Sequence, residues 1–525
     1  MPFRVRHVYM LLVIMYLILL FNYFQISYRD NYVTEVMDDC FEKNNFEGLD
    51  NIIFDDDQKN NHVVLNSYGN ENVNWKNLTG SNLLKSKFHQ AKFQVRIAAL
   101  NKTYPISEKI KIIIEPRNSK LIQKLQSSYF RVQIIGARIF SPQRVKSNDS
   151  KILIYESPLL DPGYYTLQVR LMFYDYPNIY SLETIDKQLD PDNYPNIELI
   201  DKLIVNGKWD FKVKPPQNPW KWLNSTLTKT CNEFNNLTGR WTNDLKIFHP
   251  YKCQIPNYKF LDFPEALQIN NKFRYNWLRF LGDSNSRGLF QVLVNRLGAK
   301  CVKIFEGINQ GIQYVCTLAY NVERSNNFNS LPHELILTSE LYFPESSNDL
   351  EFLLNSTFSE ICQPFKECKD KFHCDFTKSY STDSLKICGT KTSDHVFISI
   401  GTLISEWSSS RIDKYLERIF SNIQEKHLNK RITFMTTNAI NVHKIPKDYE
   451  AQYLIRNNFR IDNINELLRK YLNQNKTEMM DLIDIWSTTQ PIWEFSRDEV
   501  HFYKNIYNVH AQLVIDKLVE GLKNL

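Results

Sequence analysis

The chain has 525 residues, of which 43% are hydrophobic and 13% aromatic, and this apolar content is sufficient for two or three domains with substantial cores. Its net charge of +6 is small for this length, the lysines are scattered, and no basic block is interleaved with aromatic residues. Nucleic acid is therefore excluded as an expected partner.

The N-terminal residues predict a membrane anchor. Residues 8–24 form one apolar run that Arg4 and Arg6 precede and several acidic residues follow. Residues 1–7 are therefore expected in the cytosol and the residues after about 25 in a lumen. A cleaved signal peptide is the alternative, but its apolar region is normally shorter and ends in small residues. The short span favours the thinner membranes of the ER or Golgi, with a single-pass type II topology.

Cysteines and sequons fit an oxidising lumen. Cys40 stands alone near the N-terminus, where it could link two chains, and eight further cysteines occur from Cys231 onward, which favours disulfides. Zinc at Cys362, Cys368 and Cys374 is an alternative, but the spacing matches no common zinc site, so no metal is expected. Sequons for N-glycosylation occur at Asn77, Asn101, Asn148, Asn224, Asn236, Asn355 and Asn475.

The first half of the lumenal part predicts a stem followed by a β domain. Residues 25–88 are rich in Asn and Asp and are expected to have little structure of their own. Short apolar segments separated by turns then favour an antiparallel, immunoglobulin-like (Ig-like) β-sandwich over residues 89–214, which ends before a Pro-rich joint. The expected strands are 93–97, 109–114, 130–135, 151–155 and 164–173.

Residues 220–525 predict an α/β domain. Expected strands alternate with expected helices, and such alternation is typical of a parallel sheet with helices on both faces. An active site is then expected at the carboxyl ends of the strands. The strands are expected at 277–281, 333–337, 395–400 and 432–436, and the helices at 289–297, 410–426, 464–472 and 503–522.

The clearest chemical signal is the segment Leu281–Arg287, LGDSNSR. An apolar run before it and a helical pattern after it predict a strand, a tight turn and a helix start, which present the Ser284 hydroxyl beside the N–H groups of a helix N-terminus. Serine needs a base, and Asp498 and His501 near the C-terminus are an acid and a histidine three residues apart. The two segments predict a serine hydrolase or acyltransferase. The alternative is that Asp283 or Ser284 merely caps the helix.

The residues around Ser284 and His501 resemble those of a known family. Gly282-Asp283-Ser284-x-x-Arg287 with Asp498-x-x-His501 resembles the PC-esterase group of the SGNH (GDSL-like) superfamily, which includes glycan O-acetyltransferases. The segments Gly239-Arg240-Trp241 and Pro250–Pro256, with Cys231, are similar to the entry segment of that group, and the resemblance covers about residues 228–525. An Ig-like module ahead of it is similar to the neurexophilin and PC-esterase domain proteins in particular.

The resemblance implies an SGNH-like three-layer fold and a lumenal, single-pass enzyme that acts on the hydroxyls of a carbohydrate or glycoprotein. Ser284 would be the nucleophile, His501 the base and Asp498 its orienter, with Glu499 an alternative orienter. No cofactor is implied, because the acyl donor is a substrate, with acetyl-CoA as one candidate and acetyl the expected group. Whether a sugar hydroxyl or water accepts the acyl group is left open.

The oxyanion site departs from the family pattern. Gly401 follows an expected strand, but Thr402 and Leu403 come next, without the Asn or His that usually completes the site. The Ser284 N–H and Gly401 are expected to bind the oxyanion, with Thr402 or Asn438 as the substitute donor. Arg287 is expected either to bind a substrate carboxylate or to pair with a nearby acid. A catalytically silent binding or adhesion protein is the second functional hypothesis; a lipase of the α/β-hydrolase type is weaker, because no Gly-x-Ser-x-Gly occurs.

Overall fold

The computed structural model describes the C-terminal five-sixths of the chain with gaps. The described residues all belong to one compact unit, 77–525. They are 89, 91–98, 103–176, 199–215, 231, 237–255, 277–303, 311–324, 327–342, 373–375, 386–388, 393–407, 409–426, 430–445, 456–475, 477 and 479–523.

Several predictions fall outside these residues, namely the cytosolic tail, the membrane span 8–24, the stem and Cys40. Within the described ranges, no helix is both long and apolar enough to cross a membrane. The same ranges contain no group of three His, Cys, Asp or Glu residues that could hold a metal ion, and Cys362 and Cys368 lie outside them.

The first part of the described chain is a β-module. Several of its strands bury every second side chain, as in Phe93, Val95 and Ile97, because successive side chains of a strand point to opposite faces. The strand over Tyr129–Gly136 is instead buried on both faces. A short connection carries the 3-10 helix η2 (Ser119–Leu121) and α4 (Ile122–Gln126). The strands are β1 (Phe93–Ile97), β2 (Thr103–Pro105), β3 (Lys109–Pro116), β4 (Tyr129–Gly136), β5 (Ile139–Phe140), β6 (Gln143–Val145), β7 (Leu153–Pro158), β8 (Gly163–Phe173) and β9 (Lys202–Lys214).

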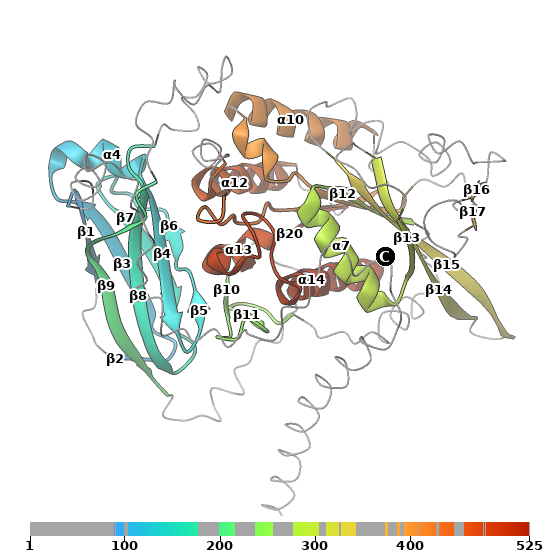
Figure 1. Ribbon diagram of the computed structural model, residues 1–525, viewed down its shortest axis with the longest axis horizontal. Coiled ribbons are helices and arrows are strands. Elements are labelled where there is room, and N and C mark those ends of the chain that lie inside the picture. The colour runs from blue at the N-terminus through green and yellow to red at the C-terminus, as the bar shows by residue number, and fades with distance from the viewer. Residues whose placement is uncertain are drawn as a thin grey trace, which may run out of the picture. The chain divides into compact units, whose positions relative to one another are not determined.

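The β-module has one hydrophobic core between two groups of strands, β6-β7-β3-β1 and β9-β8-β4-β5 (Figure 1). The ring of Phe93 on β1 meets that of Phe130 on β4 edge to face, with the centroids 5.2 Å apart. The expected strands are all present. The expectation of purely antiparallel pairing was wrong at two places, because β9 runs parallel to β1 and to β2.

Strand β9 is a further difference from the sequence prediction, which had no strand there. Its Asn206-Gly207 pair has the composition of a turn, which hides the alternating pattern on either side. In the structure Asn206 has a φ of 57°, and the pairing with β8 shifts register between Gln168 and Arg170. A Cβ on Gly207 would lie 2.6 Å from the Val169 carbonyl oxygen. The pair therefore forms a β-bulge inside one long strand.

The second part is an α/β module built on a seven-stranded sheet of order β13-β14-β15-β12-β18-β19-β20. Strands β15, β12, β18, β19 and β20 are parallel, whereas β13 and β14 extend one edge in antiparallel fashion. The strands are β12 (Trp277–Gly282), β13 (Lys300–Lys303), β14 (Gly311–Arg324), β15 (Asn327–Leu341), β18 (His395–Ser399), β19 (Arg431–Met435) and β20 (Met480–Ile483). A separate pair is β16 (His373–Asp375) with β17 (Lys386–Cys388).

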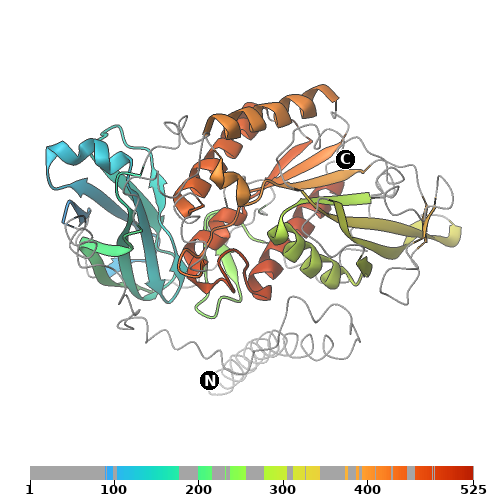
Figure 2. The same ribbon diagram turned by 45° about the horizontal axis from the view of Figure 1, so that its top comes forward.

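Helices cover both faces of this sheet, as the sequence predicted (Figures 1 and 2). On one face Leu281 packs in a core with α10 (Ser409–Lys426) and α12 (Asn458–Gln474). On the other face Phe280 contacts Phe290 of α7 (Ser284–Leu297), and α7 packs against α14 (Lys504–Lys523). Shorter helical segments are η7 (Leu403–Glu406), α13 (Ile485–Thr489) and η9 (Gln490–Phe495).

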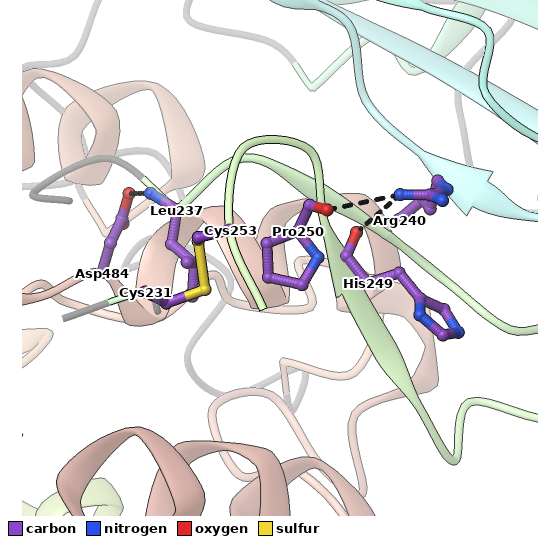
Figure 3. The surroundings of a disulfide bond; sticks show 7 residues. All are labelled: Cys231, Leu237, Arg240, His249, Pro250, Cys253 and Asp484. Carbon is purple, nitrogen blue, oxygen red and sulfur yellow. Dashed lines mark hydrogen bonds between the residues drawn. A yellow bond between two sulfur atoms is a disulfide. The ribbon is translucent and has the colours of Figure 1, made fainter. Parts of the chain in front are cut away.

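A hairpin joins the two modules. Strands β10 (Gly239–Trp241) and β11 (Phe248–Pro250) pair with each other, and β10 also pairs with β5 of the β-module. The Trp241 indole N–H donates to the Thr488 carbonyl oxygen of the α/β module, 2.7 Å away. Figure 3 shows the base of this hairpin, where a disulfide joins Cys231 to Cys253 and the Leu237 N–H donates to Asp484.

A buried ion pair crosses the centre of the sheet. The Arg279 guanidinium on β12 binds the Glu340 carboxylate on β15 through two hydrogen bonds of 2.9 and 2.5 Å. Both side chains are almost fully buried, at 0% and 2% exposure. Because a lone charge in such a place is very unfavourable, each of the two residues requires the other.

Candidate active site

Ser284 lies at the carboxyl end of the central strand β12, where the chain turns into α7. Gly282 allows this turn to be tight, since a Cβ there would lie 2.7 Å from the Ser286 Cβ and 2.8 Å from the Ser399 Cβ. Asp283 is the N-cap, and Ser284 is the first residue of the helix. The expected strand, turn and helix start are thereby confirmed.

Asp283 has a structural role. One carboxylate oxygen accepts hydrogen bonds from the N–H groups of Asn285 and Ser286, at 3.0 and 3.4 Å, which caps α7. The other accepts from the Thr402 N–H at 3.2 Å. Gly401, with a φ of +72°, brings this loop against the aspartate: a Cβ on it would lie 3.0 Å from the Asp283 carboxylate. Asp283 thus fixes the loop after β18 to the start of α7.

The structure brings Ser284, His501 and Asp498 together. His501 Nε2 lies 2.7 Å from the Ser284 hydroxyl oxygen, and His501 Nδ1 lies 2.8 Å from Asp498 Oδ2. With Nδ1–H donating to the carboxylate, Nε2 is left free to accept from the serine hydroxyl. These three side chains therefore form a continuous hydrogen-bonded chain across 217 residues of sequence.

Asp498 is held as a carboxylate by its own turn. Its Oδ1 accepts from the backbone N–H groups of Val500 and His501, at 3.0 and 2.7 Å. Partial burial alone would raise the pKa of Asp498, but the hydrogen bonds from His501 and these backbone groups outweigh it and lower the pKa to about 2. His501 Nδ1 thus pairs with Asp498 and not with Glu499, the alternative orienter. The backbone carbonyl oxygen of Glu499 accepts from the Asn441 N–H.

The site is open to solvent. The His501 side chain is 34% exposed and the Asp498 side chain 38%, and Ser284 is partly exposed. A bulky substrate can therefore approach the Ser284 hydroxyl without a buried channel, and the serine is within reach of a soluble acylating probe.

Tyr507 connects the two halves of the site, although no motif marks it in the sequence. Its hydroxyl donates to the Asn285 side-chain oxygen at 2.9 Å and lies 3.4 Å from the Phe502 N–H. Asn285 follows Ser284, and Phe502 follows His501. Gly288 makes room for the ring, since a Cβ there would lie 3.0 Å from it. Tyr507 is thus a positioning residue between α7 and the histidine segment.

Arg287 lies one turn into α7. Its guanidinium lies 3.4 Å from the Gln313 side-chain oxygen on β14, and its Nε is buried without a hydrogen-bond partner. The sequence left two roles open for Arg287, and pairing with an acid is not observed: in the described part of the chain no carboxylate forms an ion pair with Arg287. Binding of a substrate carboxylate stays a prediction.

The candidate oxyanion donors differ in what they contact. The Thr402 N–H is engaged by Asp283, and the Thr402 hydroxyl accepts from Arg456. The Asn438 side-chain amide donates to the carbonyl oxygens of Ala439 and Val500, both at 2.9 Å. The Thr402 N–H and the Asn438 amide therefore have their hydrogens in use within the protein, whereas the Thr402 hydroxyl acts there as an acceptor.

Two of the predicted glycosylation sites lie in the described ranges. Asn148 is exposed in the turn before β7. Asn475 is the C-cap of α12, and its amide bonds to the Tyr471 carbonyl oxygen and to Gln424. The remaining sequons, at Asn77, Asn101, Asn224, Asn236 and Asn355, lie outside the described residues.

Comparison with known proteins gives matches in structure only. No family model and no curated protein matches the sequence. A lipase/acylhydrolase from Enterococcus faecalis is 13% identical, over 47% of this chain and 96% of that one, with a TM-score of 0.27. A peptidoglycan O-acetylesterase is 7% identical, over 52% and 98%, with a TM-score of 0.27. A salicylyl-acyltransferase from a tetracycline biosynthetic pathway is 8% identical, over 79% and 83%, with a TM-score of 0.25. With TM-scores this low, the chemistry of the site has to be derived from its own geometry.

Proposed function

We propose that this chain is a serine-dependent O-acyltransferase or esterase that works through an acyl-serine intermediate. The observation that carries the proposal is the hydrogen-bonded chain from Ser284 through His501 to Asp498, at 2.7 and 2.8 Å. A serine hydroxyl becomes nucleophilic when a neutral imidazole accepts its proton, and a carboxylate on the far nitrogen stabilises the imidazolium that forms.

In the first half-reaction His501 Nε2 takes the Ser284 proton while the serine oxygen attacks the acyl carbonyl. The tetrahedral oxyanion forms beside the N-terminus of α7, where the Ser284 N–H and the Gly401 N–H are the proposed donors. His501 then returns the proton to the leaving group as the carbon–oxygen or carbon–sulfur bond of the donor breaks. The acyl group remains on Ser284 as an ester.

In the second half-reaction His501 removes a proton from the acceptor, whose oxygen attacks the carbonyl carbon of the acyl-serine. The bond between the acyl carbon and the Ser284 oxygen then breaks, and His501 returns the proton to Ser284, which regenerates the free enzyme. We propose a glycan hydroxyl as the acceptor and acetyl as the group, which makes the enzyme a transferase; with water as the acceptor it is an esterase. Support for the glycan comes from the resemblance of the Gly-Asp-Ser and Asp-x-x-His segments to glycan O-acetyltransferases. The same resemblance supports an SGNH-like α/β module and a lumenal enzyme. The short strands of residues 89–214 support an Ig-like β-module, and the short apolar run 8–24 supports a location in the ER or Golgi.

The test is labelling of the purified full-length chain with a fluorophosphonate, which reacts only with an activated serine. We expect the wild type to be labelled, and Ser284→Ala and His501→Ala to remain unlabelled. Ser286→Ala is the matched control, because its hydroxyl is buried two residues away without a hydrogen-bond partner. Absence of labelling in the folded wild type would favour the silent binding protein instead.

A further inference from the structure

A cavity of about 660 Å³ lies between the β-module and the α/β module, away from Ser284. Residues of β4 and of the segment 142–153 line one side, and residues of α12, α13 and η9 line the other. Figure 1 shows β4 and β6 on the side of the β-module that faces α12 and α13. Ser284, His501 and Asp498 are not among its lining residues. Its volume lies in the range of pockets that hold small ligands.

Aromatic side chains from both modules line this cavity. They are Tyr129, Phe130 and Tyr155 of the β-module, and Phe459 and Trp486 of the α/β module. The rings of Tyr129 and Phe459 stack across the junction, with their centroids 5.1 Å apart and their planes at 19°. The negative face of an aromatic ring attracts C–H groups that carry partial positive charge, and the apolar face of a sugar ring presents such groups.

Polar groups without a protein partner also face the cavity. Within the described residues, burial and neighbouring charges act on the Asp462 carboxylate and on the hydroxyls of Tyr129 and Tyr155, but no protein group forms a hydrogen bond with them. Burial, with a smaller contribution from the charge of Glu466, raises the pKa of Asp462 to about 6, and the charges of Arg469 and Arg144 offset this only in part. A ligand that donates hydrogen bonds would supply what these groups lack.

The remaining lining residues favour a neutral ligand over a cationic one. The amides of Gln143, Asn463 and Gln490 can each donate and accept hydrogen bonds, which suits a molecule with many hydroxyls. Apart from Asp462, the charged side chains that line the same cavity are two cations, Arg144 and Lys146, and two acids, Asp149 and Glu466. Their charges offset one another and do not select a cation.

We propose that this cavity binds a neutral saccharide, with a sugar ring against the aromatic wall and its hydroxyls on Asp462, Tyr129 and Tyr155. The site is separate from the serine chemistry and does not depend on it. The β-module thereby contributes one wall of a carbohydrate site, and the α/β module contributes the carboxylate.

The experiment is binding of the full-length chain to an array of immobilised neutral and acidic oligosaccharides, followed by calorimetric titration of the strongest neutral binder. We expect Asp462→Asn to weaken binding at least about tenfold, because hydrogen bonds to a charged acceptor are the strong ones. Tyr155→Phe should weaken it a few-fold. Glu417→Gln, which changes an exposed acid on α10, is the matched control and should bind as the wild type does.

Ser284→Ala distinguishes this site from the proposed active site, since it should bind the saccharide unchanged. Loss of binding in that variant would move the ligand to the serine and overturn the inference. It is also overturned if no neutral oligosaccharide binds, or if Asp462→Asn binds as the wild type does. Binding of tetraethylammonium that depends on Asp462, without any saccharide binding, would identify an amine site instead. Thermal unfolding of each variant verifies that it is folded.

Discussion

Removal of one oxygen atom at Tyr507 tests how the two halves of the site are held together. Tyr507→Phe keeps the ring packed beside Gly288 but deletes the hydroxyl that donates to Asn285. Burial raises the pKa of Tyr507, so this hydroxyl is a protonated donor at any working pH. The loss leaves the buried Asn285 oxygen unsatisfied, at a cost of about 1–3 kcal/mol. The 3.4 Å contact to the Phe502 N–H is long and adds little.

We therefore expect the free energy of unfolding of Tyr507→Phe to fall by about 2 kcal/mol in urea titrations. The turnover of a chromogenic acetyl ester should fall roughly tenfold in kcat, because His501 loses its fixed position relative to Ser284. Tyr503→Phe is the matched control, since Tyr503 lies just before the same helix and is 47% exposed. Equal stability and equal kcat for the two variants would refute the positioning role.

Three further changes have defined outcomes. Asp498→Asn should lower kcat roughly a thousandfold, because an amide no longer holds His501 in the tautomer with its hydrogen on Nδ1. A fall of less than tenfold would contradict the role of Asp498 as orienter. Arg279→Met should lower the free energy of unfolding in urea by about 3–5 kcal/mol, because it leaves the charge of the Glu340 carboxylate buried without a counter-ion. The double variant Arg279→Met with Glu340→Leu should recover much of this loss, because it removes both buried charges. Because the pKa of Asp462 is raised in the folded state, the folded chain binds the Asp462 proton more tightly than the unfolded chain does. The free energy of unfolding therefore falls as pH rises from about 4 to 6. Asp462→Asn should thus gain up to about 3 kcal/mol at pH 7 relative to pH 4, and a pH-independent difference between the two proteins would refute this.

Local sequence patterns were sufficient for β12, for the start of α7 and for the choice of Ser284, Asp498 and His501, but not for β9, β14 or β20. The apolar run before Gly282 and the helical pattern after Ser284 depend on neighbours in sequence, which is why the strand, the turn and the helix start were predictable. His501 and Asp498 were predictable because they form an Asp-x-x-His pattern, which supplies the base and the acid of a catalytic triad. That His501 reaches Ser284 depends on how α14 packs against α7, and the sequence contains no such information.

Contacts between distant residues were not predictable. Arg279 stands in an otherwise apolar strand, and its partner Glu340 is 61 positions away. Asp283 was expected at most to cap a helix, whereas it also holds the Thr402 loop. Asp462 had no motif at all, because its environment is created by the junction of two modules. In each case the partner depends on tertiary packing, whereas the periodicity of hydrophobic residues gives information only about neighbours in the sequence.

The hairpin β10–β11 has a consequence for dissecting this protein. Its strand β10 continues the sheet of the β-module through the Trp241 and Ile139 pair, yet it belongs in sequence to the chain that leads into the α/β module. A cut in the Pro-rich joint near residue 215 would leave β5 with an unpaired edge on one fragment and β10 with an unpaired edge on the other. Exposed strand edges of this kind promote aggregation. Expression of either half alone is therefore expected to give insoluble material, and a soluble N-terminal fragment should extend through residue 255.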